Sequence, residues 1–99
     1  MKKAEAEHII EQAAARKIDV GFTKHFWDEA KECAPGLTKN DVYTVLRRGS
    51  VFGAPVRDDE YLCHKVKLRA ELPDFGRLEI VVAITVRESL VCITIYDID

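Results

Sequence analysis

The chain has 99 residues, of which 47% are hydrophobic and 32% charged, with a formal net charge of −2. These values are ordinary for a globular domain, and they exclude a globally basic surface for nucleic acid. The length fits one domain over residues 1–99 with a single hydrophobic core. The N-terminal residues carry acids and no long apolar run, so we expect neither a signal peptide nor a membrane association, and a cytoplasmic location.

The first third of the chain predicts two helices and a short strand. Over residues 2–17 an apolar stripe recurs at helical spacing, which predicts an extra N-terminal helix: Ala6, Ile9, Ile10, Ala13 and Ala14. Residues 20–22 are compatible with a short edge strand. Thr23 is suited to cap the second helix, whose apolar stripe is anchored by Phe26 and Trp27 and which ends at Pro35 and Gly36.

The third helix has the clearest local signals. Thr38 is a good N-cap, and Asp41 three residues later favours the positive end of the helix dipole. Arg47 and Arg48 fall in the last turn, where cations favour the negative end of the dipole. Gly49 follows at a position that commonly adopts a left-handed conformation.

Four strands are predicted in the second half, over residues 50–56, 60–71, 78–86 and 90–96. Turns are expected at 57–59, 73–76 and 87–89. The run 78–86 is apolar on nearly every position, which predicts a central strand covered on both faces. In the last strand, Val91, Ile93 and Ile95 are expected to face the helices. The predicted fold class is α+β, with two layers in which the N-terminal helices pack on one face of a four-stranded antiparallel sheet.

Three cations, Lys65, Lys67 and Arg69, alternate along the second of these strands. Alternation places them on one face about 7 Å apart, a spacing close to that of successive phosphates in a stretched single strand of RNA. The competing interpretation is an ordinary solvated strand face. Tyr96 has the parity of the same face and offers a phenol that stacks on a base or transfers a proton.

His25 is the second candidate catalytic residue. It lies in the first turn of the second helix, with Glu29 four residues later in a position to orient the imidazole. A general base for a ribose hydroxyl and an ordinary surface histidine are both consistent with this placement. Arg48, with Arg47, is either a helix-capping residue or a phosphate ligand.

No metal or cofactor site is predicted. Cys33, Cys63 and Cys92 are scattered over three elements, which favours reduced thiols over a disulfide framework. His64 follows Cys63 directly, so alternation along a strand sends the two side chains to opposite faces. The parity of His64 matches that of Leu62 and Val66 and favours a buried, hydrogen-bonded histidine.

The order of several short motifs resembles a bacterial family of unknown function whose members begin with a Thr-x-His-Ala-x-x-Arg helix and belong to the RelE/BrnT-like toxin superfamily. The matching segments are FTKHF at 22–26, GLTKNDV at 36–42, VLRRG at 45–49, GRL at 76–78 and VCITIY at 91–96. His25 matches the family histidine, whereas Glu29 stands where the family has arginine. Lys31 and Arg48 are the candidate replacements for that arginine.

The resemblance implies a RelE-like fold and a metal-independent endoribonuclease that cleaves mRNA, in solution or on the ribosome, with a cognate antitoxin as partner. In this hypothesis Lys65, Lys67 and Arg69 bind RNA, while His25, Tyr96 and Arg48 carry the catalysis. The alternative hypothesis is a non-catalytic protein-binding module on the same fold, such as a degenerate toxin or a subunit of a complex. Glu29 and the acidic balance favour this alternative. The sequence leaves monomer and homodimer both open.

Overall fold

The chain folds into three helices and five strands in the computed structural model, which describes residues 1–85, 87 and 89–98. The helices are α1 (Lys3–Ala14), α2 (Lys24–Cys33) and α3 (Lys39–Arg48). The strands are β1 (Val20–Phe22), β2 (Ser50–Asp58), β3 (Cys63–Leu72), β4 (Gly76–Thr85) and β5 (Leu90–Asp97). The α+β class predicted from the sequence is therefore confirmed.

The strands form one mixed sheet in the order β1-β5-β4-β3-β2. Strands β2 to β5 are antiparallel neighbours, while β1 pairs with β5 in parallel, with Gly21 opposite Val91. The described sheet is thus five-stranded and mixed, and the prediction of a four-stranded antiparallel sheet is wrong in this respect. The short edge strand expected at residues 20–22 is confirmed as β1, but its parallel pairing could not be predicted because its partner β5 lies far along the sequence.

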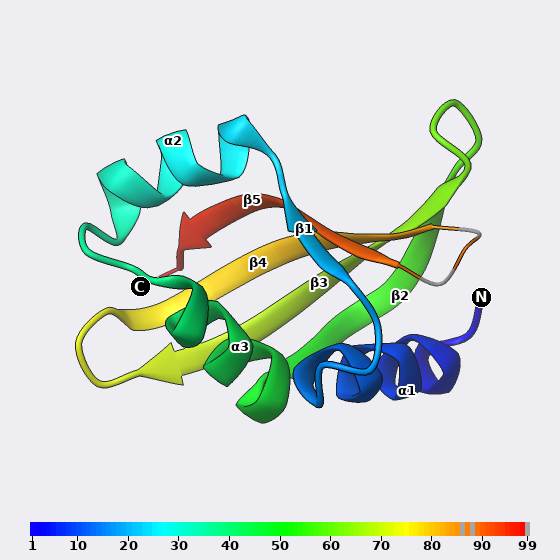
Figure 1. Cartoon of the computed structure of the whole chain (residues 1–99), viewed down its shortest axis with the longest axis horizontal. Helices are drawn as coiled ribbons and strands as arrows, with labels where there is room; N and C mark the ends of the chain where they lie inside the picture. Colours follow the sequence, from blue (N-terminus) through cyan, green and yellow to red (C-terminus); the bar gives the residue numbers. More distant parts are fainter. Residues whose placement is uncertain (86, 88, 99) are drawn as a thin grey trace.

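All three helices pack on one face of the sheet, as Figure 1 shows for α1 and α3 in front of the strands and α2 along β5. The buried side of α1 is the predicted stripe, with Ala6, Ile10 and Ala13 at most 3% exposed. Phe26 is fully buried, whereas Trp27 is only partly buried, and its ring centre lies 5.0 Å from those of Phe22 and Phe26. No helix in the described ranges is long and apolar enough to cross a membrane.

The helix caps follow the sequence closely. The backbone N–H of Phe26 donates to Thr23 Oγ1 at 3.0 Å, and that of Asp41 donates to Thr38 Oγ1 at 3.2 Å. Gly49 differs from the prediction, because its backbone is extended with φ −73° rather than left-handed. A Cβ at Gly49 would lie 2.5 Å from the carbonyl oxygen of Val45 and 3.0 Å from that of Arg69. Glycine is therefore needed here for the close approach of the chain to β3, not for a special φ.

The turn between β2 and β3 lies later than predicted. Strand β2 continues to Asp58 and β3 begins at Cys63, so neither a turn at 57–59 nor a strand start at residue 60 is correct. Asp58 Oδ1 accepts hydrogen bonds from the backbone N–H groups of Glu60 and Tyr61, which builds the turn from the side chain of the strand's last residue. Leu62 adopts φ 50° and is 55% exposed, so its predicted burial is wrong.

A β-bulge in β5 changes which side chains face the helices. Val82 pairs with Cys92, but Val81 pairs with Thr94, so Ile93 is an extra residue in the ladder. Val91 and Ile93 consequently face away from the helices, contrary to the prediction, and Leu90 and Cys92 are fully buried in their place. Val86, at the end of the predicted strand 78–86, and Glu88, in the predicted turn 87–89, lie outside the described residues.

Candidate functional site

The open face is the side of the sheet opposite the helices, and it collects the cations singled out in the sequence. Lys65, Lys67 and Arg69 alternate on β3 with the buried residues of the other face. Across the sheet, Arg69 pairs with Glu79, which in turn pairs with Tyr96, and directly opposed residues share a face. The cations and the phenol therefore share one face as predicted, although β4 lies between Arg69 and Tyr96.

Strand β4 was predicted to be covered on both faces, but its side on the open face has no helix over it. The helix layer packs only on the side of Leu78, Ile80, Val82 and Ile84. On the open side, Val81 and Thr85 are partly exposed, whereas Ala83 is small enough to be 7% exposed among its neighbours. Both alternating sets of residues in this strand are apolar or small, so the sequence pattern did not distinguish the helix-covered face from the open one.

Two of the three cations are already paired with carboxylates. Arg69 Nε lies 2.9 Å from Oε1 of Glu79, and the Arg69 guanidinium stacks 3.5 Å from the centre of the Phe52 ring. Glu79 is only 6% exposed, so this ion pair is largely shielded from water. Lys65 Nζ lies 3.1 Å from Oδ2 of Asp58. Lys67 is exposed and has no such partner among the described residues.

The pairing of Lys65 with Asp58 keeps both groups charged. The hydrogen bond from the Lys65 ammonium lowers the pKa of the Asp58 carboxyl below its ordinary value of 3.8. The same hydrogen bond raises the pKa of Lys65 above its ordinary value of 10.5. An anion that binds Lys65 must therefore compete with a fully ionised carboxylate throughout the neutral range.

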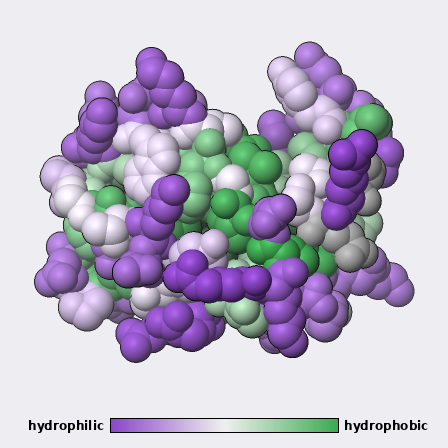
Figure 2. Space-filling model, viewed as in Figure 1, coloured by the Kyte–Doolittle hydropathy of each residue, from purple (hydrophilic) through white to green (hydrophobic). Residues whose placement is uncertain are grey.

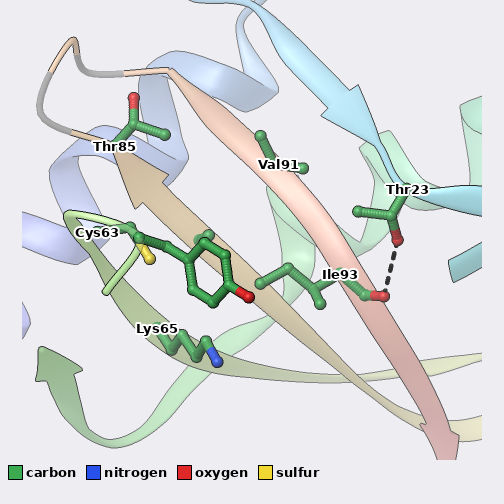
Figure 3. Close-up of a pocket in the computed structure, with 8 residues that line it drawn as sticks. Thr23, Cys63, Lys65, Thr85, Val91 and Ile93 are labelled. Atoms are coloured by element: carbon green, nitrogen blue, oxygen red, sulfur yellow. Dashed lines mark hydrogen bonds between the residues drawn. The ribbon is translucent and has the colours of Figure 1, made fainter. Parts of the chain in front are cut away.

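A cavity of about 460 Å³, the larger depression, opens on this face between β3, β4, β5 and the start of α2. Figure 3 shows Cys63 and Lys65 from β3 and Val91 and Ile93 from β5 around it. Thr23 closes one end, where its Oγ1 donates to the carbonyl oxygen of Ile93 at 3.0 Å. The remaining lining residues are Tyr61, Ala83 and Thr85. Figure 2, viewed from the helix side, shows apolar surface between α2 and the β2–β3 hairpin.

A second cavity of about 340 Å³, the smaller depression, lies beside the first and shares Lys65 with it. Its wall includes Phe52 and Val56, which are 50% and 63% exposed, and its floor is Val81. These two wall residues flank an irregularity in β2 where the register with β3 shifts, and Gly53 within it has φ 78°. Phe52 lies opposite Lys67 and Val56 opposite Lys65, so both apolar side chains project on the open face.

His25 and Arg48 belong to the helix layer rather than to the open face. His25 Nε2 lies 2.8 Å from Oε1 of Glu29, the i+4 pairing expected from the sequence, and its side chain is 63% exposed. Arg48 is exposed in the last turn of α3. Among the described residues, no hydrogen bond or ion pair joins His25, Arg48 or Tyr96 to another of the three. The candidate catalytic residues are thus divided between the two layers.

The three thiols lie apart. Cys92 is fully buried among the helices, and burial raises its pKa to about 12. Cys63 is 5% exposed at the larger depression, and Cys33 Sγ donates to the carbonyl oxygen of Ile95. The described residues contain no group of three potential metal ligands. His64 is partly exposed rather than buried as predicted, with Nε2 3.4 Å from the Met1 amino nitrogen.

Glu79, Asp58 and Phe52 contribute to the site without having been identified from the sequence. Glu79 could have been found, because the turn that places Leu72 opposite Gly76 also places Arg69 opposite Glu79 when residues are counted outward. Phe52 could not, since the register shift between Phe52 and Val56 breaks such counting. Asp58 was missed because it was assigned to a turn at 57–59, whereas it is the last residue of β2.

Comparisons with known protein families, curated proteins and solved structures found no match to this chain. The class that the fold and the open face define is a small α+β protein with an uncovered, partly apolar and partly cationic sheet face. Exposed aromatic rings beside ammonium groups are suited to single-stranded nucleic acid, because the rings stack on bases and the ammonium groups attract phosphates.

Proposed function

We propose that the protein binds single-stranded RNA on the open face and cleaves it as a toxin-like, metal-independent endoribonuclease of a RelE/BrnT-like toxin–antitoxin pair. The observation that carries this proposal is the presence of Lys65, Lys67 and Tyr96 on one helix-free face with the exposed ring of Phe52. Aromatic rings on a sheet face stack on bases, while lysines track the phosphates.

The charge pairs limit how much of the affinity is electrostatic. Only Lys67 is free of a carboxylate partner in the described structure, while Lys65 and Arg69 must exchange theirs for phosphates. For a single strand, log K falls with log salt with a slope of about −0.7 for each neutralised phosphate. We therefore expect a shallow slope between about −0.7 and −2, corresponding to one to three phosphate contacts.

For catalysis, the geometry favours Tyr96 over His25 and Arg48. The Tyr96 side chain is 46% exposed on the same face as Lys67. The 2′ oxygen bonds to phosphorus and releases its proton to water, while the bond from phosphorus to the 5′ oxygen breaks. The Tyr96 phenol donates a proton to the departing 5′ oxygen and regains one from water, and the Lys67 ammonium stabilises the charge on the pentacoordinate phosphate. The products are a 2′,3′-cyclic phosphate end and a 5′-hydroxyl end.

The test combines induced expression with cleavage of single-stranded RNA by purified protein in EDTA. We expect growth arrest and cyclic phosphate ends with the parent protein, and strongly reduced cleavage with Lys67→Ala and with Tyr96→Phe. Matched controls on the helix layer are Lys3→Ala and Tyr43→Phe, which should retain activity. Full activity of both open-face variants, or complete inhibition by EDTA, would refute the proposal.

The second candidate is a non-catalytic protein-binding module, for which the proposed antitoxin or another subunit is the partner. It is favoured by the same ion pairs, which neutralise two of the three cations. It is also favoured by the exposure of Phe52 and Val56, because exposed apolar patches commonly mark protein interfaces. Co-purification from the native host separates the two functions. Loss of a partner with Val56→Asp but not with Lys67→Ala, in the absence of RNA cleavage, would select the binding module.

A further inference from the structure

The two depressions on the open face are adjacent and share one cation. Lys65 lines both, and Lys67 lines only the smaller one. Their volumes, about 460 and 340 Å³, fall within the range of roughly 300–1,000 Å³ typical of small-molecule sites. Each has an apolar floor and an exposed ring at its wall, Tyr61 in the larger and Phe52 in the smaller, with exposed fractions of 69% and 50%.

This arrangement repeats along β3 with the period of a nucleotide chain. Lys65 and Lys67 are two residues apart on one strand, so their side chains emerge about 7 Å from each other. Rings and cations thus occur in two sets, each able to hold one base and one phosphate. The hydroxyl groups of Thr23 and Thr85 at the larger depression already form hydrogen bonds, to Ile93 and Phe26 and to Ser89 respectively, so stacking is the main contact that this depression offers to a base.

We propose that the open face holds two consecutive RNA nucleotides in a fixed register, with one base in the larger depression against Tyr61 and the next in the smaller depression against Phe52. Lys65 binds the phosphate between the two bases, and Lys67 binds the phosphate on the side of the smaller depression. This register rests on the RNA binding proposed above, and it adds which residues contact each base.

Asp58 limits access to the central phosphate. Its Oδ2 holds Lys65 Nζ, while its Oδ1 accepts the backbone hydrogen bonds of the β2–β3 turn. Asp58→Asn keeps the acceptor that builds the turn and removes the competing charge. We expect this variant to bind RNA about two- to fivefold more tightly. The gain is small because a partly exposed ion pair is weak, so an incoming phosphate loses little by displacing it. Asp59→Asn in the same turn is the matched control, since the Asp59 carboxylate pairs with Arg57 instead.

The register is tested by titrating the protein with the dinucleotide pUpU and with two analogues that each lack one base, followed by NMR or calorimetry. Loss of a stacked ring costs roughly 5- to 100-fold in affinity. Tyr61→Ala should weaken pUpU and one analogue by this factor but leave the other analogue unchanged, and Phe52→Ala should show the opposite pattern. Leu62→Ala, an exposed apolar residue of the same hairpin that lines neither depression, should leave all three affinities unchanged.

The outcomes separate the register from RNA binding itself. The crossed pattern, together with tighter binding by Asp58→Asn, supports the register. Equal weakening of all probes by both ring variants, or weaker binding by Asp58→Asn, overturns the register while RNA binding stands. Absence of binding to the dinucleotide and to an octamer of uridine overturns both.

Discussion

The buried thiol of Cys92 predicts a specific loss of stability at alkaline pH. The side chain is fully buried, and burial raises its pKa from the ordinary value of 9.0 to about 12. Above pH 9 the unfolded chain therefore releases this proton while the folded chain keeps it, so the unfolded state binds fewer protons and stability falls as pH rises. The slope is about 1.4 kcal/mol per pH unit, which amounts to about 4 kcal/mol over the full interval.

Comparison with Cys92→Ala isolates this contribution. Near pH 8 the variant should be less stable by about 1–2 kcal/mol, because it loses buried volume from the core. Above pH 9 the difference should shrink by about 1.4 kcal/mol per unit, so that the variant becomes the more stable protein between about pH 9.7 and pH 10.5. Urea unfolding at several values between pH 8 and 11 measures both curves, and contributions common to the two proteins cancel in their difference. A difference that stays constant with pH would refute the reasoning.

Two further substitutions test contacts that position the site. Gly49→Ala should destabilise the fold by roughly 1–3 kcal/mol, since its Cβ would collide with the Val45 carbonyl oxygen, and chemical denaturation would measure the loss. Gly21→Ala, whose Cβ would meet Val91 at 3.8 Å, is the tolerated control, and equal effects would contradict the contact. Glu79→Gln should lower the free energy of unfolding by about 1–2 kcal/mol, because it weakens the bond to Arg69. The same substitution should cost less in a protein that already carries Arg69→Met, and equal losses in the two backgrounds would show that the two residues are not coupled.

Local signals were sufficient for part of the fold. The caps at Thr23 and Thr38 depend on atoms within three residues, and the turn before Gly76, which has φ 73°, depends on four consecutive residues. Such interactions can be predicted from the sequence because the residues that make them are neighbours in the chain. The helix stripes were predicted for the same reason, since each helix repeats its apolar face every three or four positions.

The direction of the β5 side chains could not be predicted in this way. From Leu90 to Ile93 every residue is apolar, so both alternating sets are suited to a core and only the far end distinguishes them. The extra residue at Ile93 reverses the assignment without leaving a glycine or proline as a local sign. Ile95 and Tyr96, beyond the bulge, keep the orientation expected from the sequence, and for that reason the phenol was placed correctly although Val91 and Ile93 were not.

The electrostatics of the open face also depend on contacts between strands. The sequence predicts three cations in a row, but their effect on a polyanion depends on Asp58 and Glu79, which reach them from β2 and β4. These carboxylates leave the Lys67 ammonium as the one described member of the row without an anionic partner. RNA binding on this face must then draw most of its free energy from stacking on exposed rings, because phosphate contacts at Lys65 and Arg69 replace existing ion pairs. It follows that removing a ring should weaken binding more than removing Lys65, the reverse of what the charge pattern alone would suggest.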